Sequence, residues 1–175
     1  KIVVVDFEIL YNPWPRGPLI VRRREWPSVS RTVPKAKVHV IRPSTVGIPI
    51  LARSFSMVTF YRELSALVRR LRPNLILDYA ISTGLPALAI ARRFNIPFAM
   101  HVLDALHTLV PSKVLHPIAR AIERTLLRSA DHSVYINQEL QDYGVKMGAH
   151  KERAHTIGTG VDLDTFRPDI EAASL

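Results

Sequence analysis

Short apolar runs alternate with helix-like segments along most of the chain, and this order constrains the fold more than any other feature. Six runs have the length and the β-branched or aromatic content of buried strands. These runs span residues 2–5, 38–41, 75–79, 97–102, 133–136 and 154–157. Strands that alternate with helices pair in parallel through right-handed crossovers. The sequence therefore predicts an α/β fold with three α/β/α layers and a mainly parallel sheet.

Five further segments predict helices. They span residues 19–33, 54–71, 85–94, 113–129 and 138–147. The clearest is 54–71, in which Met57, Phe60 and Leu64 recur at helical spacing on one face. The segment 19–33 contains Pro27, where we expect a kink or a new first turn.

The composition narrows the class of protein. The 175 residues are enough for one full-sized domain. The chain has no cysteine, which excludes disulfides and thiolate metal sites. Its apolar runs are shorter than the ~20 residues of a membrane-spanning helix. The formal net charge of +9 attracts anions, so phosphorylated substrates, anionic lipid headgroups and nucleic acid are all open as partners.

Polar side chains appear where the run 97–102 ends, at His101, Asp104 and His107. Ligands of open α/β sheets gather beyond the carboxyl ends of the strands. A neutral imidazole at His101 could hydrogen-bond a substrate or stabilise developing charge, and the alternative is a structural histidine bonded to a backbone carbonyl. We expect Asp104 and His107 to contact substrate or to cap the loop. The three residues lack a helical ligand pair and a fourth ligand, so we expect no metal site.

Ser82, Thr83 and Gly84 stand immediately before the predicted helix 85–94. Their backbone amides could bind an anionic group at a helix N-terminus. A plain N-cap is the alternative.

The loop after the first run, residues 6–18, contains Asn12, Trp14, Arg16 and Gly17. Loops of this length in compact domains are usually functional or disordered, and the aromatic content argues against disorder. Trp14 could form a platform for an acceptor with Arg16 beside it. The alternative is a hydrophobic plug over the edge of the sheet.

Two groups of arginines are candidates for contact with an anionic bilayer. They are Arg22, Arg23 and Arg24 in the segment 19–33, and Arg120, Arg124 and Arg128 at i, i+4 and i+8 in the segment 113–129. The alternative for both groups is a solvated face, which is the usual role of a charge run.

Three stretches resemble the N-terminal, acceptor-side half of a retaining GT-B glycosyltransferase of the GT4, or group 1, family. They are R-P-N-L-I-L-D-Y-A-I-S-T-G-L-P-A-L at 72–88, N-I-P-F-A-M-H-V-L-D at 95–104, and S-A-D-H-S-V-Y-I-N at 129–137 followed by H-T-I-G-T-G-V-D-L-D-T-F-R-P at 155–168. The resemblance covers residues 67–168 well and the first sixty residues poorly. Members often carry paired glycines after the first strand, where this chain has only Gly17.

The resemblance implies a Rossmann-like domain over residues 1–168 and a truncated interdomain linker over 169–175. The other half of the GT-B architecture, with its Glu-x7-Glu donor site, is expected to follow. His101 would then lie at the reacting centre, while loops 12–17 and 44–53 hold the acceptor. Gly158, Gly160 and Asp162 would shape the turn toward the donor side.

The same resemblance implies the reaction. A sugar moves from a nucleotide-sugar donor to a lipid or saccharide acceptor with retention of configuration, without a cofactor or a protein-bound metal. The isolated domain is expected to be inactive, cytoplasmic and peripheral on the inner face of a membrane.

Two alternatives come from other functional classes. A dinucleotide-binding oxidoreductase domain is disfavoured because the first run leads into D-F-E-I-L-Y-N-P and not into a glycine fingerprint. A basic anion-binding or nucleic-acid-binding α/β module would bind with a steep dependence on salt. The chain shows no nucleic-acid motif, so we expect no nucleic acid as a partner.

Overall fold

The structure is a computed structural model that describes residues 2–7, 15–29, 33 and 35–160. Its second half is built on a four-stranded parallel sheet with the order β6-β7-β8-β9. The strands are β6 (Ile76–Asp78), β7 (Phe98–Val102), β8 (His132–Tyr135) and β9 (Ala154–Thr156). The predicted α/β class, a Rossmann-like domain with a mainly parallel sheet, is confirmed.

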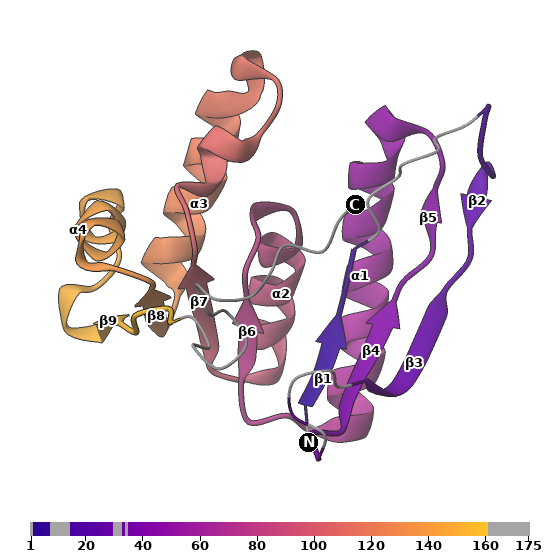
Figure 1. Cartoon of the computed structure of the whole chain (residues 1–175), viewed down its shortest axis with the longest axis horizontal. Helices are drawn as coiled ribbons and strands as arrows, with labels where there is room; N and C mark the ends of the chain where they lie inside the picture. The colour runs from indigo at the N-terminus through magenta and orange to yellow at the C-terminus, as the bar shows by residue number, and fades with distance from the viewer. Residues whose placement is uncertain (1, 8–14, 30–32, 34, 161–175) are drawn as a thin grey trace, which may run out of the picture.

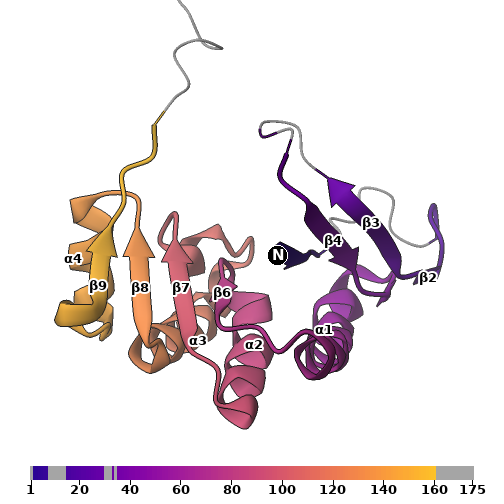
Figure 2. The same cartoon turned by 90° about the horizontal axis from the view of Figure 1, so that it is seen from below.

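Three helices connect these strands, namely α2 (Ile81–Phe94), α3 (His116–Ser129) and α4 (Gln138–Met147). The strand order shows that each crossover steps to the next strand in the same direction. Right-handed crossovers that step in one direction place their helices on one face of a sheet. Figure 2 shows this arrangement, with the strands in front of the three helices.

The first half holds two smaller sheets. The strands and the helix that follows them are β1 (Ile2–Val5), β2 (Ile20–Val21), β3 (Arg24–Val29), β4 (Val38–Arg42), β5 (Thr45–Val46) and α1 (Pro49–Leu71). Strands β1 and β4 pair in parallel, β3 joins β4 in antiparallel orientation, and β2 pairs with β5. Helix α1 packs against α2 and so joins the two halves (Figure 1).

The predicted helix over 19–33 is wrong, because this segment contains β2 and β3. The pairing of β3 with β4 shifts its register between Trp26 and Val29, and Ser28 has a positive φ of 64°. Proline donates no hydrogen bond, so sheets accept it at edges and bulges. Pro27 therefore lies at a bulge in an edge strand and does not kink a helix.

Three helix starts also differ from the prediction. Helix α1 begins at Pro49 and not at residue 54, and β5 covers Thr45–Val46, so the predicted acceptor loop 44–53 is wrong except at residues 44 and 47–48. Helix α2 begins at Ile81 and not at residue 85, so Ser82, Thr83 and Gly84 lie inside its first turn. Helix α3 begins at His116, with Pro117 in its first turn, where a missing backbone donor is tolerated. Residues 113–115 form a short 3-10 helix, η2 (Lys113–Leu115), before it.

The main core lies between the parallel sheet and its helices. In β7 the side chains of Phe98, Met100 and Val102 are buried in this core with Leu126 of α3 and Tyr135 of β8. Because successive side chains of a strand point to opposite faces, Ala99 and His101 lie on the face away from these helices. None of the described helices is long and apolar enough to cross a bilayer.

Candidate functional site at the carboxyl edge of the sheet

His101 lies in the carboxyl half of β7, opposite Val134 of β8. Its side chain is half-buried, and the centroid of its ring lies 5.1 Å from that of Tyr79 at a tilt of 58°. Tyr79 directly follows β6 and is 49% exposed. Among the described residues no backbone carbonyl accepts a hydrogen bond from the His101 ring. Two rings from neighbouring strands thus stand together at the edge where ligands bind in such sheets.

The loop after β7 is anchored by a buried carboxylate. Glu123 of α3 is fully buried and accepts hydrogen bonds from the backbone N–H groups of Leu106 and His107, at 3.2 and 3.1 Å. Its Oε2 also lies 2.8 Å from Nδ1 of His107. Buried charge is tolerated where several hydrogen bonds satisfy it. Glu123 therefore ties the loop that follows β7 to the helix that follows the loop.

His107 belongs to this anchor. Its Nδ1 also lies 3.1 Å from the hydroxyl of Tyr143 on α4. Burial, together with the charge of Glu123, raises the pKa of Tyr143, so that this hydroxyl keeps its proton. Asp104, by contrast, is exposed, and its Oδ1 accepts the N–H of Ala105 at 2.7 Å. The structure thus holds the His107 ring at Glu123 and leaves Asp104 at the surface.

Asp78 is a second buried carboxylate at the same edge, at the end of β6. It is 7% exposed and accepts hydrogen bonds from the N–H of Ala80 at 3.1 Å and the hydroxyl of Thr83 at 2.8 Å. Burial raises the pKa of Asp78 to about 6, although these hydrogen bonds oppose the shift. Asp78 thus ties the N-cap residue Ala80 and the first turn of α2 to the end of β6, although α2 has no side-chain cap hydrogen bond.

Residues 82–84 lie next to the junction between β6 and α2. Thr83 is the hydroxyl donor to Asp78. At Gly84 an added Cβ would lie 2.5 Å from Cδ1 of Leu126, so helix α2 can approach α3 closely only with glycine here. Ser82 is half-buried in the same turn.

Glu123 and Asp78 were not among the predicted site residues, although each left a signal in the sequence. Glu123 stands four residues after Ala119 and three before Leu126, which places it on the buried stripe of an amphipathic helix. Asp78 stands just before a helix start, where carboxylates cap free N–H groups.

The remaining candidates lie elsewhere. Arg16 is exposed and Gly17 is half-buried, while Asn12 and Trp14 fall outside the described residues. Gly158 and Gly160 follow β9, are exposed, and would have no atom within 4 Å of an added Cβ. Asp162 also falls outside the described residues. Within the described part of the chain, no three acidic or histidine residues could share a metal ion.

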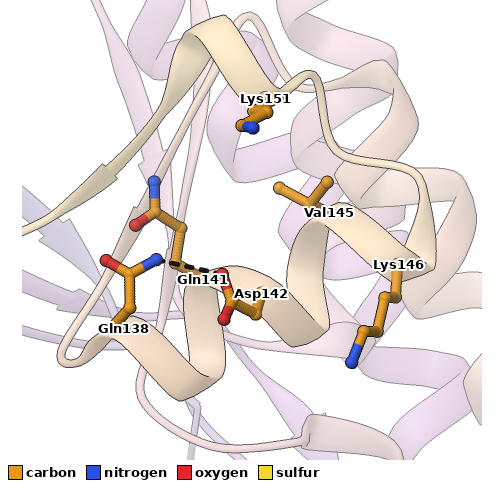
Figure 3. A pocket seen from close by; sticks show the side chains of 6 residues that line it. All are labelled: Gln138, Gln141, Asp142, Val145, Lys146 and Lys151. Carbon is orange, nitrogen blue, oxygen red and sulfur yellow. Dashed lines mark hydrogen bonds between the residues drawn. The ribbon is translucent and has the colours of Figure 1, made fainter.

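Two surface pockets lie in the described part of the chain. One, of about 320 Å³, lies beyond the carboxyl end of β4 and is lined by Arg23, Pro43, Ser44, Phe55, Thr59, Arg62, Glu63 and Ala66. The other, of about 240 Å³, is lined by Gln138, Gln141, Asp142, Val145, Lys146 and Lys151 (Figure 3). In the second pocket Nε2 of Gln138 donates to Oδ1 of Asp142 at 3.0 Å. The second pocket contains none of the predicted site residues, whereas the first includes the start of the predicted acceptor loop 44–53.

Comparison with known proteins gives one family. The family model described as Glycosyltransferase Family 4 matches residues 14–165, from the segment before β2 to beyond β9. No curated protein matches the chain. The matched range contains the strand that carries His101 and both buried carboxylates at the carboxyl edge.

Proposed function

The chain belongs to glycosyltransferase family 4, and from this premise we propose that it is the acceptor-side half of a retaining GT-B glycosyltransferase. The complete enzyme moves a sugar from a nucleotide-sugar donor to a lipid or saccharide acceptor in the cytoplasm. The observation that carries the proposal is the half-buried ring of His101 beside Tyr79 at the carboxyl edge of the sheet. Family membership also disfavours the oxidoreductase and the nucleic-acid module as alternatives.

His101 supports transfer through a directed hydrogen bond. A ring nitrogen at the open edge can bond a sugar hydroxyl, or can stabilise charge that develops as the bond to the leaving group breaks. The Tyr79 ring is partly exposed beside it and offers an apolar surface with a polar tip, which suits a sugar ring. The nucleotide-sugar acts as a substrate, and no cofactor or metal takes part in this scheme.

The acceptor occupies the first half of the chain in this proposal. The pocket beyond β4 combines the exposed ring of Phe55 with the cation of Arg62, so it can hold an apolar or sugar surface and an anionic group together. Ser44, which directly precedes β5, lines the same pocket. Gly158, Gly160 and Asp162 lead toward a second domain that supplies the donor.

The scheme is tested by comparing the chain alone with a protein that also carries the proposed donor-binding domain. Transfer from radiolabelled nucleotide-sugars should require the second domain. In that protein H101A should lower kcat by about 100-fold or more, the scale of losing one catalytic hydrogen-bonding group. The control is H132A, an exposed histidine at the opposite end of the neighbouring strand. Transfer by the 175 residues alone, or full activity of H101A, would overturn the proposal.

A further inference from the structure

The end of α3 exposes apolar side chains that a globular surface usually buries. Leu109 is 60% exposed, Val114 84%, Leu115 48% and Ile118 60%. We call residues 109–118 the α3 tip. Figure 1 shows this end of α3 rising beyond α2 and α4, so these exposed residues belong to a segment that projects from the rest of the second half. Several large apolar side chains exposed within one short segment are typical of an interaction site.

Basic residues follow this apolar surface along the helix. They are Lys113 and His116 in the α3 tip, and Arg120, Arg124 and Arg128 further along α3. All three arginines are exposed. The helix has one acidic residue, Glu123, and its full burial keeps that charge away from the surface. The projection therefore combines an apolar end with a strongly cationic flank.

The geometry points to an anionic lipid bilayer as the partner of the α3 tip. Leu109, Val114 and Ile118 would enter the boundary between headgroups and acyl chains, where apolar side chains leave water. Arg120 and Arg124 would lie against the anionic headgroups. A convex apolar end can enter a fluid layer without a preformed cavity, whereas a folded protein partner would need one. This inference goes beyond sugar transfer, because binding to a bilayer needs neither donor nor acceptor.

The base of the projection is fixed in a way that suits insertion. Glu123 holds the N–H groups of Leu106 and His107, directly before the α3 tip. The same loop leaves β7 next to His101, so docking would bring the carboxyl edge of the sheet near the membrane surface. Among the two acceptor classes, this favours a lipid-linked acceptor.

The two arginine groups that were candidates for membrane contact lie far apart in the structure. Arg22, Arg23 and Arg24 lie at β2 and β3, with α1 and α2 between them and α3 (Figures 1 and 2). Arg23 bonds Glu25 and Glu63. We therefore assign membrane contact to the α3 tip and not to the β2–β3 segment.

The absence of cysteine allows a direct test with a single dye. V114C and, as a matched control on α1, V58C would each carry an environment-sensitive fluorophore. Val58 is 58% exposed, so neither substitution disturbs a buried contact. Vesicles would contain phosphatidylcholine alone or with phosphatidylglycerol at about two to one, where the anionic lipid supplies the surface potential. We expect a blue shift and a brighter dye at position 114 with the anionic vesicles only, and no change at position 58.

The charge requirement is tested by co-sedimentation with the same vesicles. The double substitution R120Q/R124Q should weaken partitioning about 30-fold, at about fivefold for each basic residue near the surface. The control R70Q/R93Q removes the same charge from exposed positions on α1 and α2 and should change partitioning little. Thermal melts would verify that all variants fold alike.

Several results would overturn the inference. The protein could fail to bind anionic vesicles, or the dye at position 114 could remain exposed to water on bound protein. The two double variants could also lose the same amount of vesicle partitioning. A dye shift that grows with protein concentration in the absence of vesicles would also overturn it, because it would identify the α3 tip as a contact between copies of the chain.

Discussion

The two halves of the chain use their strands in opposite ways. In β7, in the second half, four of five residues are buried and only His101 is half-buried. In β3, in the first half, all six residues are exposed. Both strands are hydrogen-bonded into a sheet, so sheet pairing alone does not explain what holds each half. The second half is held by a core, and the first half depends far more on contacts near the surface.

The charged groups of the halves differ in the same way. In the second half Glu123 and Asp78 are buried and accept several hydrogen bonds each. In the first half, Arg23 bonds two glutamates, and Arg42 bonds Asp6 and lies over the ring of Trp26 at 5.3 Å. Partly exposed ion pairs stabilise by about 1 kcal/mol at most, whereas breaking a buried polar network costs several times more. We therefore expect the largest mutational effects in the second half.

The largest expected effect is that of E123A. The substitution leaves the N–H groups of Leu106 and His107 without an acceptor in a buried place, so the free energy of unfolding should fall by about 3 kcal/mol. Urea unfolding followed by circular dichroism measures this. E152A, at a site whose side chain is 71% exposed, serves as the control and should change stability by less than about 0.5 kcal/mol. Equal losses in both variants would contradict a buried anchor.

The next effect in size concerns the close approach of α4 to β8. An added Cβ at Gly144 would lie 2.0 to 2.4 Å from the ring and hydroxyl of Tyr135, which is fully buried and cannot rotate away. Such overpacking should lower the free energy of unfolding of G144A by about 2 kcal/mol. G158A adds the same methyl group where no atom lies within 4 Å and should be close to neutral. If G144A were as stable as the parent, the second half would be packed more loosely than its buried core indicates.

A third effect depends on pH. The pKa of Asp78 is raised to about 6 from its ordinary value of 3.8, so the folded protein holds this proton more tightly than the unfolded chain does. Its contribution to stability is fully present below pH 3.8 and is lost as the pH rises through 6. Each pKa unit corresponds to about 1.4 kcal/mol, so the full loss is about 3 kcal/mol, of which on the order of 2 kcal/mol falls between pH 4 and pH 7. The difference in stability between the parent and D78N should therefore change between pH 4 and pH 7, whereas a constant difference would show that Asp78 ionises in the fold as it does in water.

The difference in burial between the two halves also explains which strands could be predicted from the sequence. The strands β6 to β9 were predicted within two residues at each end, because core strands flanked by turns and helices leave apolar runs. The position of His101 at the carboxyl edge followed from the same pattern. Strand β3 leaves no burial pattern, because all its residues are exposed, and Pro27 concealed its strand character further.

The buried carboxylates show a second limit. Local propensity marks a cap or a helix face, but it does not show which distant group will meet a side chain. Glu123 accepts hydrogen bonds from residues 16 and 17 positions earlier in the chain, and the fold of the crossover brings these residues next to it. The raised pKa of Asp78 arises mainly from burial at the helix junction, where Leu126 also contacts α2. Such features depend on tertiary packing, which a single sequence does not encode in any short window.

The smallest expected effect is that of R23A, which lies in the first half of the chain. Arg23 bonds Glu63 of α1 at 2.9 Å and also bonds Glu25, but its side chain is 40% exposed. Solvent screens such a network, so R23A should lower the free energy of unfolding by less than about 1 kcal/mol. Because salt shortens the range of surface electrostatics, the difference between R23A and the parent should shrink further at about 1 M salt. Urea titrations at low and high salt measure both values. A loss as large as that of E123A, unchanged by salt, would show that the β3 edge is held by buried polar contacts after all, and the distinction between the halves would fail.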